Sequence, residues 1–581
     1  MEKRAIYAIL LTFLVIVAWS LIQSKFFPQP TNIQPREVKK EQGPLQEKVP
    51  EKRTGIKESI ILKGEKPGDK QKVVPQREIT VETQNYFAVF TSEDARLRHF
   101  RLKKYKDRAE ESRLATKLIQ IIDEVMGKKA EESKRPEPLD LVNTSENKNL
   151  PFGLTFNGAN LPVEENWEVD KDHLRLVEDS EKGEITFSKS LENGLRILKR
   201  VKFTSDQYTI NLEVEVQNTS TKEITSQLGF DWIGEIELTK LAERGDKDFG
   251  LEYAFLRNQK VEKKSFGGAS RSGCVPSCGT QKKTTVEPFE ITERGEIKWF
   301  SFEGEYFAAL FVPPPSKEIT LFIKGSEKDL LKAEIRSPHV SISPRERVNI
   351  AYQVYLGPKD EDRLKTLGVD AEKLVDFGFF TIIAKPLLWF IRLTHKATGN
   401  YGIDIIIISI LIKIIFLPLT QISFKSMKEM QKVQPEMNRL KEQFKNDKAR
   451  LQQEIMLLYK RRKINPMSGC LPMLIQIPVF IALYNALQNG IEMRHAHFFL
   501  WITDLSAKDP IYVTPIIMGA TMFIQQKMTP TAGDPAQAKM FLLMPVMFTF
   551  LFLSFPSGLV LYWLINNVLS IAHQYYLNKK T

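Results

Sequence analysis

Apolar and polar positions change pattern several times along the 581-residue chain. Residues 5–22 are almost wholly apolar and follow Lys3 and Arg4, as in a cleaved signal peptide or a retained signal anchor. Because this run is long enough to cross a bilayer, we expect residues 1–23 to form a transmembrane signal anchor. Residues 24–76 are rich in Pro, Lys, Glu and Gln, a composition that predicts a disordered tether.

Between residues 77 and 374 the chain alternates apolar and polar positions in short runs. The segment YTINLEVEV, residues 208–216, has an apolar or aromatic side chain at every second position, which is typical of a half-buried antiparallel strand. Similar runs, separated by Gly, Pro, Asn or Asp, are EITFSKS, GEIKWFSFEG, EYFAALFV, EITLFIKG and VNIAYQVYLG. Together they predict an all-β twisted sandwich with a helix inserted near residues 114–126.

After residue 374 the pattern becomes helical. Residues 375–399 are apolar but interrupted by charged residues and a proline, so we expect an amphipathic helix at the membrane interface. Residues 400–581 predict a core of five transmembrane helices, over residues 401–420, 468–488, 511–527, 539–555 and 557–575. With the amino-terminal anchor, the chain is predicted to be a polytopic α-helical membrane protein with six transmembrane helices and an extracytoplasmic β-sandwich.

Charges in the loops predict how these helices are oriented. Residues 421–466 carry twelve Lys or Arg and five acids, and their apolar positions repeat as in a helical hairpin. Residues 489–510 carry two Lys or Arg and three acids. By the positive-inside rule the first loop and both termini are cytoplasmic, and the sandwich lies outside the cytoplasm.

Composition and motifs narrow the possible functions. The formal net charge of +12 is not gathered into a basic stripe with aromatic residues, so we expect no specific nucleic-acid partner. No HExxH, GxxxxGK or GxSxG motif is present, and Ser557 and His573 lie too far apart on one helix to act as nucleophile and base. We therefore expect neither an enzyme nor a cofactor or metal site. Cys274 and Cys278 are compatible with either a looped disulfide or two free thiols.

One lysine lies inside the first span of the core. The run IIIISILIKIIFLPLT contains Lys413, about 10 Å from its cytoplasmic end at a rise of about 1.5 Å per residue. Ser409 lies one turn earlier on the same helix face. Counting along other spans places Gln476 and Asn567, with Asn566 beside it, at about the same depth. Hydrocarbon leaves such groups unsatisfied, so we expect them to face one another or water.

Two hypotheses explain these polar groups. In the first, interhelical hydrogen bonds hold a helix bundle together. In the second, the groups line a water-filled, positively charged groove open to the cytoplasm, which is favoured because no intramembrane acid after residue 405 neutralises Lys413. A small-solute or ion transporter using the same groove is an alternative function. Such a protein needs access from both sides, whereas the outer halves of the spans are nearly purely apolar.

Six segments carry a resemblance to a known family. They read NYGIDIIIISILIKIIFLPLT, SMKEMQKVQPEM, NPMSGCLPMLIQIPVFIALYNAL, FLWITDLSAKDP, MTPTAGDP and MPVMFTFLFLSFPSGLVLYWLINN. In them the chain resembles the YidC family of membrane protein insertases, and the likeness extends into the sandwich, where it is weak around residues 105–135. The resemblance implies a Gram-negative inner-membrane protein with a large periplasmic domain. It further implies an insertase and chaperone that inserts nascent membrane proteins and helps them fold, alone or with the Sec translocon.

The resemblance also implies roles for individual residues. In the family a positive residue of the second span lies in a hydrophilic groove. Here that residue is Lys413 where arginine is usual, so two-point binding of a carboxylate is lost. Tyr562 and Trp563 match the substrate-contacting position of the last span. The substrate slide of the family, on the third and fifth spans, corresponds to Met473, Ile477, Phe480, Met547, Phe550 and Leu551.

The implied partners are nascent membrane proteins, the Sec translocon and membrane lipids. The signal recognition particle, its receptor and the ribosome are further candidates at the cytoplasmic loops. The sandwich is similar to those of sugar-processing enzymes, which makes carbohydrate or partner binding a third hypothesis, resting on fold analogy.

Overall fold

The computed structural model describes residues 75–580 except for 111–112, 126–134, 143, 145–148, 161–165, 236–251, 266–288, 326–329, 463–470 and 529–534. The predicted anchor, residues 24–74 of the predicted tether, and the alternatives for Cys274 and Cys278 lie outside the described residues. The described residues divide into two compact units, which are described separately: residues 75–434 with 471–580, and residues 435–462.

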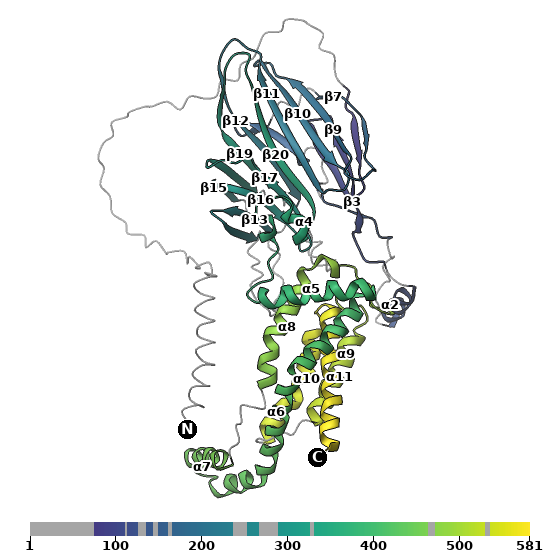
Figure 1. The fold of residues 1–581 in the computed structure, drawn as a ribbon, viewed down its shortest axis with the longest axis vertical. Helices are drawn as coiled ribbons and strands as arrows, with labels where there is room; N and C mark the ends of the chain where they lie inside the picture. The colour runs from purple at the N-terminus through teal and green to yellow at the C-terminus, as the bar shows by residue number, and fades with distance from the viewer. Residues whose placement is uncertain are drawn as a thin grey trace, which may run out of the picture. The chain divides into compact units, whose positions relative to one another are not determined.

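The described strands form three β-sheets (Figure 1). The largest has nine strands in the order β14-β13-β16-β17-β20-β11-β10-β9-β7. A six-stranded sheet has the order β15-β18-β19-β12-β5-β6, and a five-stranded sheet the order β4-β3-β2-β1-β8. Neighbouring strands are antiparallel except β1 and β8, which run parallel.

The strands have the following bounds: β1 Glu78–Glu82, β2 Tyr86–Thr91, β3 Arg96–Lys106, β4 Pro138–Asp140, β5 Gly153–Phe156, β6 Ala159–Asn160, β7 Glu168–Val169, β8 His173–Arg175, β9 Lys182–Ser190, β10 Leu195–Thr204, β11 Thr209–Asn218, β12 Ile224–Glu235, β13 Glu252–Arg257, β14 Lys260–Ser265, β15 Phe289–Gly295, β16 Ile297–Glu303, β17 Phe307–Val312, β18 Ile319–Gly325, β19 Leu330–Ile342 and β20 Arg347–Pro358.

The alternation of apolar and polar residues determines which side chains of these strands are buried. In β11 the side chains of Ile210, Leu212 and Val214 are fully buried, whereas Asn211 between them is exposed. Full burial of such a side chain stabilises the fold by about 1.5–3 kcal/mol. The five other predicted runs lie in β9, β16, β17, β18 and β20, and the predicted inserted helix is α2, Arg113–Val125. The expectation of a β-rich domain is confirmed, and α2 is a helix within it.

Aromatic side chains join the sheets in one hydrophobic core. Phe230 of β12 stacks on Tyr352 of β20 at 5.5 Å between ring centroids, and it also contacts Phe311 of β17 at 5.8 Å. These contacts connect the six-stranded sheet with the nine-stranded sheet, because β12 belongs to the first and β17 and β20 to the second.

A lysine is buried in this core. Lys199 of β10 is 0% exposed, and its ammonium donates hydrogen bonds to the carbonyl oxygens of Ala95 at 2.7 Å and Phe152 at 2.6 Å. Burial disfavours the charged form and lowers the pKa of Lys199 to about 7. Nearby, Arg96 forms an ion pair with the fully buried Asp231 at 3.0 Å. The sandwich therefore contains charged groups whose protonation is coupled to its folding.

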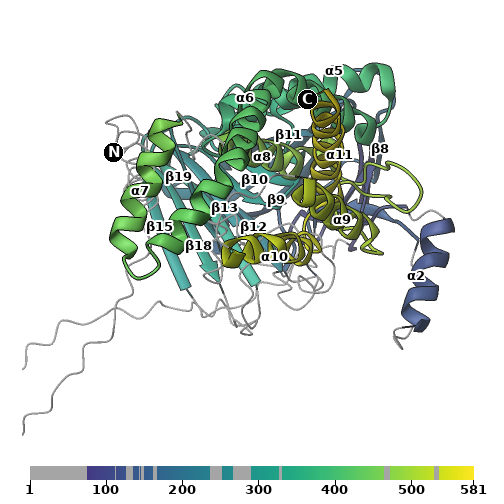
Figure 2. The ribbon, with the colours of Figure 1, turned by 90° about the horizontal axis from the view of Figure 1, so that it is seen from below.

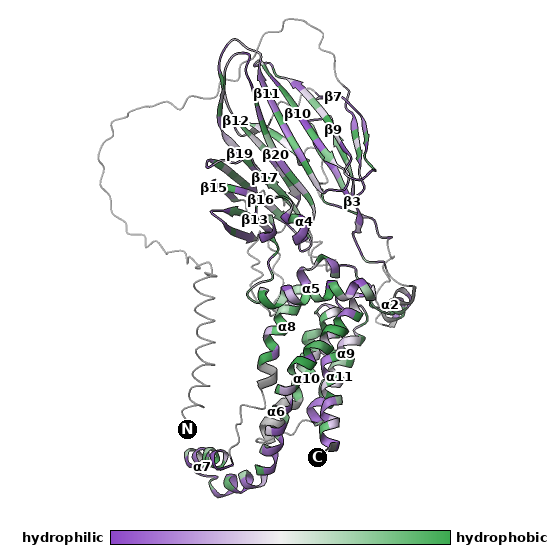
Figure 3. Ribbon diagram, viewed as in Figure 1, coloured by the Kyte–Doolittle hydropathy of each residue, from purple (hydrophilic) through white to green (hydrophobic). Residues whose placement is uncertain are grey.

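The remaining elements are helical, with these bounds: α4 Glu361–Lys365, η3 Ala371–Leu374, α5 Thr381–Thr398, α6 Tyr401–Gln443, α7 Lys448–Arg461, α8 Leu471–Asn489, η5 Ile491–Met493, α9 Val513–Met528, α10 Pro535–Phe552 and α11 Ser557–Lys580. Figure 3 shows that the residues of the sheets alternate between hydrophilic and hydrophobic, whereas long parts of the helices after α5 are hydrophobic.

One helix of the described residues, α6, is long and apolar enough to cross a membrane by length and composition. A shorter apolar helical segment, Leu543–Phe552, lies in α10. The number of six transmembrane helices therefore stays a prediction. α6 continues without a break past residue 420, so the predicted second span and the first arm of the predicted hairpin form one helix.

The second arm of the hairpin is α7. Its first turn is capped by Asp447, whose carboxylate accepts a hydrogen bond from the backbone N–H of Arg450 at 3.0 Å. Within residues 435–464 the Tyr459 hydroxyl donates to the sulfur of Met437 at 3.3 Å, and Arg462 forms an ion pair with Glu436. The two arms thus contact each other, as expected for a helical hairpin.

Candidate functional site

The candidate site lies among α6, α8, α9 and α11. Ile405 and Ile408 of α6, Leu483 of α8 and Leu559 of α11 are buried in one hydrophobic cluster. α9 packs along α11 and α10 (Figure 2). The α9–α10 contact is close, because a Cβ atom on Gly519 would lie 1.9 Å from the Thr549 hydroxyl oxygen. These contacts hold the polar residues of the helices near one another.

Lys413 contacts the last helix. Its ammonium donates a hydrogen bond to the hydroxyl oxygen of Ser570 at 2.6 Å, and this hydroxyl donates to the carbonyl oxygen of Asn566 at 2.6 Å. In the part of the chain that the structure describes, no carboxylate lies within ion-pair distance of the ammonium. The hydrogen-bond partner of the Lys413 ammonium is thus a neutral hydroxyl. The Lys413 side chain is partly exposed, so another polar group can still approach it.

A second set of polar side chains surrounds Tyr562, two turns before Ser570 in α11. The Tyr562 side chain is fully buried, its hydroxyl has no hydrogen-bond partner among the described residues, and its polar neighbours are the side chains of Gln476 and Asn566. The Asn566 amide donates to the carbonyl oxygen of Tyr562 at 3.0 Å. Ser409 is buried and donates to the carbonyl oxygen of Ile405, in its own helix, at 2.6 Å. Gln476, Asn566 and Tyr562 thus form a polar strip between α8 and α11.

Asn567 faces a different helix. Its amide lies 3.4 Å from the carbonyl oxygen of Met518 and 3.3 Å from the hydroxyl oxygen of Thr521, both in α9. Two turns further along α11, Gln574 donates to the carbonyl oxygen of Met528 at the end of α9 at 2.6 Å. Asn567 therefore belongs to a hydrogen-bonded seam between α9 and α11. Ser570, which accepts the hydrogen bond from Lys413 of α6, lies on the side of α11 that faces α6.

Trp563 lies in an aromatic cluster. Its ring meets Phe480 of α8 edge-on at 5.0 Å between centroids, and Phe548 and Phe552 of α10 lie at 6.1 and 5.2 Å. Phe480 and Leu551, expected on the substrate slide, pack in the same hydrophobic cluster. These two residues and Trp563 thus line an internal contact of α8, α10 and α11.

Three other residues of the expected slide are at the surface. Ile477 of α8 and Met547 and Phe550 of α10 are exposed, Phe550 to 70%. The side chain of Met473 lies outside the described residues. α8 and α10 therefore present exposed apolar side chains next to a partly packed aromatic cluster.

Sequence reasoning missed two polar residues of the site. Ser570 follows Asn566 by four residues and shares its helix face, a spacing that could have identified it. His573 was considered only as a base for Ser557. In the structure the Ser557 hydroxyl donates to the carbonyl oxygen of Asp504, while His573 packs edge-on against Phe424 of α6 and has Lys413 as its charged neighbour.

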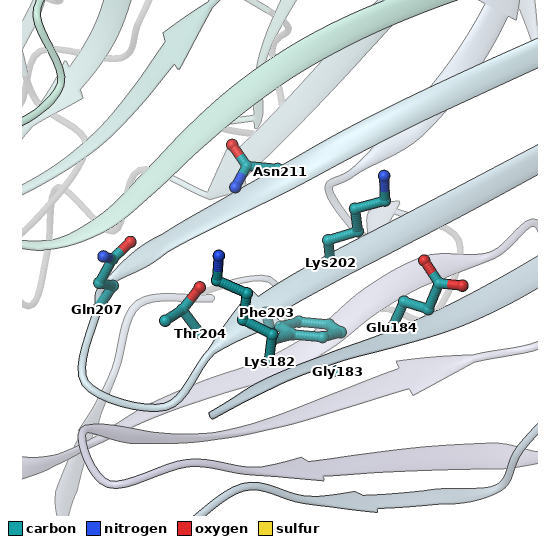
Figure 4. Close-up of a pocket in the computed structure, with 8 residues that line it drawn as sticks. All are labelled: Lys182, Gly183, Glu184, Lys202, Phe203, Thr204, Gln207 and Asn211. Carbon is teal, nitrogen blue, oxygen red and sulfur yellow. The ribbon is translucent and has the colours of Figure 1, made fainter. Parts of the chain in front are cut away.

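The sandwich has a separate hollow of about 450 Å³ on strands β9, β10 and β11 (Figure 4). Lys182, Glu184, Lys202 and Asn211 line it with charged and polar groups. Lys202 is paired with Glu213 of the neighbouring strand. Carbohydrate binding by the sandwich stays a prediction.

Comparison with known proteins identifies the family. The family described as 60Kd inner membrane protein matches residues 393–581, and the family described as YidC periplasmic domain matches residues 120–390. A protein of Syntrophus aciditrophicus named membrane protein insertase YidC is 37% identical over 589 residues, covering 100% of both chains. A protein of the same name from Geobacter sp. (strain M21) is 40% identical over 511 residues, covering 87% of this chain and 86% of the relative.

A solved structure of an active YidC insertase with its first transmembrane domain resolved is 18% identical, with a TM-score of 0.36, covering 87% of this chain and 93% of that chain. The family matches and the full-length relatives confirm the resemblance seen in the sequence. The chain therefore belongs to the YidC family of membrane protein insertases and is an inner-membrane protein with a β-rich periplasmic domain.

Proposed function

We propose that this chain inserts nascent inner-membrane proteins through a groove that is open to the cytoplasm and centred on Lys413. A short hydrophilic flank of the substrate enters the groove and stops part of the way across the bilayer. The adjoining apolar segment leaves sideways into lipid along α8 and α10. The chain also acts as a chaperone while the inserted segments fold. Insertion by this route involves no covalent step and no cofactor.

The observation that carries the proposal is the state of Lys413. Its ammonium is hydrogen-bonded to the Ser570 hydroxyl at 2.6 Å, and it has no carboxylate partner among the described residues. An acidic or polar flank of a substrate can therefore approach it without displacing an internal ion pair. A charge-assisted hydrogen bond of this kind is worth about 1.5–3 kcal/mol.

The lateral step is supported by the exposed side chains of Ile477, Met547 and Phe550. Apolar residues gain about 0.3–0.6 kcal/mol each on insertion, so a segment of about 20 residues gains roughly 6–12 kcal/mol. One central acid costs about 2.5–3.5 kcal/mol on the same scale. Partition of the segment is thus large enough to carry a short acidic flank across without nucleotide hydrolysis.

We assign the basic hairpin of α6 and α7 to cytoplasmic contacts with the ribosome, the signal recognition particle or its receptor, and we place the Sec translocon beside the insertase for larger substrates. In this topology both termini are cytoplasmic, the chain crosses the membrane six times, and α5 lies at the membrane interface. The exposed side chains of Ile382 and Trp389 on α5 support the last assignment.

Reconstitution tests the proposal. Proteoliposomes containing only this chain should insert a single-span substrate with a short acidic external tail, seen as protection of that tail from added protease. Empty liposomes should give no protection, and addition of nucleotide should change nothing. Equal protection in empty liposomes, or a requirement for ATP, would contradict the proposal. Passage of a small ion across the same liposomes would favour the transporter alternative.

A further inference from the structure

One face of the inserted helix α2 has no assigned role. At about 100° per residue the apolar positions of Arg113–Val125 fall within an arc of about 160°. The opposite side has polar and charged positions. Figure 3 shows both hydrophobic and hydrophilic residues on this helix. Among the side chains that the structure describes, this apolar face is formed by Leu118, Ile119 and Ile121.

None of the described side chains of this face is buried in the sandwich. Ile121 is 56% exposed, and Leu118 and Ile119 are partly exposed. None of these three side chains belongs to a hydrophobic cluster formed by the described residues, although the sandwich core includes residues of β3, from whose end α2 follows. An apolar face of this width on a short helix needs another partner.

The position of α2 in the sandwich indicates that partner. Tyr105, at the end of β3, packs against Phe307 at 5.2 Å between ring centroids, and Phe307 pairs with Pro358 at the end of β20. The chain leaves the sandwich from this same end toward α5. Leu374 is still buried in the sandwich core, and α5 begins at Thr381, only seven residues later. At about 3.6 Å per residue those residues span at most about 25 Å.

We propose that α2 lies on the periplasmic leaflet of the bilayer, with its apolar face among the acyl chains. The described side chains of the face are aliphatic, and the exposed Lys117 lies on the polar side of the helix, where its ammonium can reach a lipid phosphate. Because α2 is joined to a sandwich that the chain ties to the membrane, its effective concentration at the bilayer is high. A helix of only 13 residues then suffices as a second attachment. It restricts rotation of the sandwich about its connection to α5.

Fluorescence of the full-length chain in lipid nanodiscs containing phosphatidylethanolamine and phosphatidylglycerol tests this. An environment-sensitive fluorescent amino acid is incorporated at Leu118, on the apolar face, or at Gln120, on the polar face, as the matched control. Lipids with a doxyl quencher on the acyl chain should quench the label at position 118 at least threefold more than the label at position 120. Aqueous iodide should show the opposite preference.

Two outcomes would overturn the proposal. Equal and strong iodide quenching at both positions would place the helix in water. A blue-shifted label at position 118 that doxyl lipids do not quench would place the face against protein, either within this chain or in a second copy. In the variant Ile121→Asp the doxyl quenching at position 118 should fall to the level of position 120. Insertion activity of this variant, measured in parallel, shows whether it folds.

Discussion

Replacement of Lys413 by methionine tests the electrostatic role of the groove. Methionine keeps the length and apolar stem of the side chain and removes the ammonium that donates to Ser570 at 2.6 Å. The conservative variant Lys413→Arg keeps a positive charge. We therefore expect Lys413→Met to impair substrates with acidic tails and Lys413→Arg to insert them at least as well as the parent.

The size of the effect follows from the geometry. A hydrogen bond to a charged group contributes about 1.5–3 kcal/mol, and the partial exposure of Lys413 places its attraction for a substrate carboxylate at the lower end of this range. Each 1.4 kcal/mol corresponds to about tenfold in rate. The initial rate of insertion should therefore fall about tenfold for a tail with one aspartate. For the same tail with asparagine it should fall less than about twofold.

A double-mutant cycle separates this effect from general damage. Parent and Lys413→Met chains are each reconstituted and given the aspartate or the asparagine substrate, and protease protection is followed over time. A coupling of about five- to tenfold between the two changes is expected. If Lys413→Met slows both substrates equally, the charge is not acting on the tail and the reasoning is refuted.

Three further predictions concern Ser570, the two amides and the buried lysine of the sandwich. Ser570→Ala removes the acceptor for Lys413 and should slow insertion of the acidic substrate two- to threefold in the same assay, with the asparagine substrate unchanged. For the two amides, Gln476 and Asn567 are each replaced by cysteine, and a water-soluble thiol reagent is added from the cytoplasmic side. Position 476 is partly exposed and should be modified at least tenfold faster than position 567, which is buried against α9. Equal rates would contradict the separation of the polar strip from the α9–α11 seam. Because the pKa of Lys199 is lowered from 10.5 to about 7, the unfolded chain holds a proton that the folded chain lacks between these values. The free energy of unfolding of the sandwich should therefore rise by ~1.4 kcal/mol per pH unit near pH 8.5, and this gain should be lost as the pH falls toward 7. Pulse proteolysis in urea at pH 8 and 9 measures this slope, which Lys199→Met should lack.

The strands could be predicted because local alternation determines which side chains are buried. β11 is an example, since its apolar positions repeat with the two-residue period of a strand and are the buried ones. The order of the strands could not be predicted. β17 pairs with β20 across the intervening β18 and β19, and such long-range pairing leaves no local signal. The continuity of α6 beyond residue 420 was also missed, because a change from apolar to charged residues ends a span without ending a helix.

For the candidate site, the sequence predicts a depth for each polar residue but not the direction in which its side chain points. Lys413, Gln476 and Asn567 were expected at one level because each residue adds about 1.5 Å along a helix. Which neighbour each side chain meets depends on helix rotation and packing. Asn567 therefore lies against α9, whereas Ser570, which the count had not included, holds the Lys413 ammonium.

Site-specific photocrosslinking to a stalled nascent chain tests the central proposal most directly. A photoreactive amino acid is placed at Gln476 in the polar strip, at Ile477 on the exposed face of α8, or at Ile382 on α5, which is 87% exposed and serves as the control. The proposal predicts that position 476 captures the hydrophilic flank, position 477 captures the apolar segment and position 382 captures neither. Capture of the apolar segment at position 382 as efficiently as at 477, or of the flank at none of the three, would contradict it.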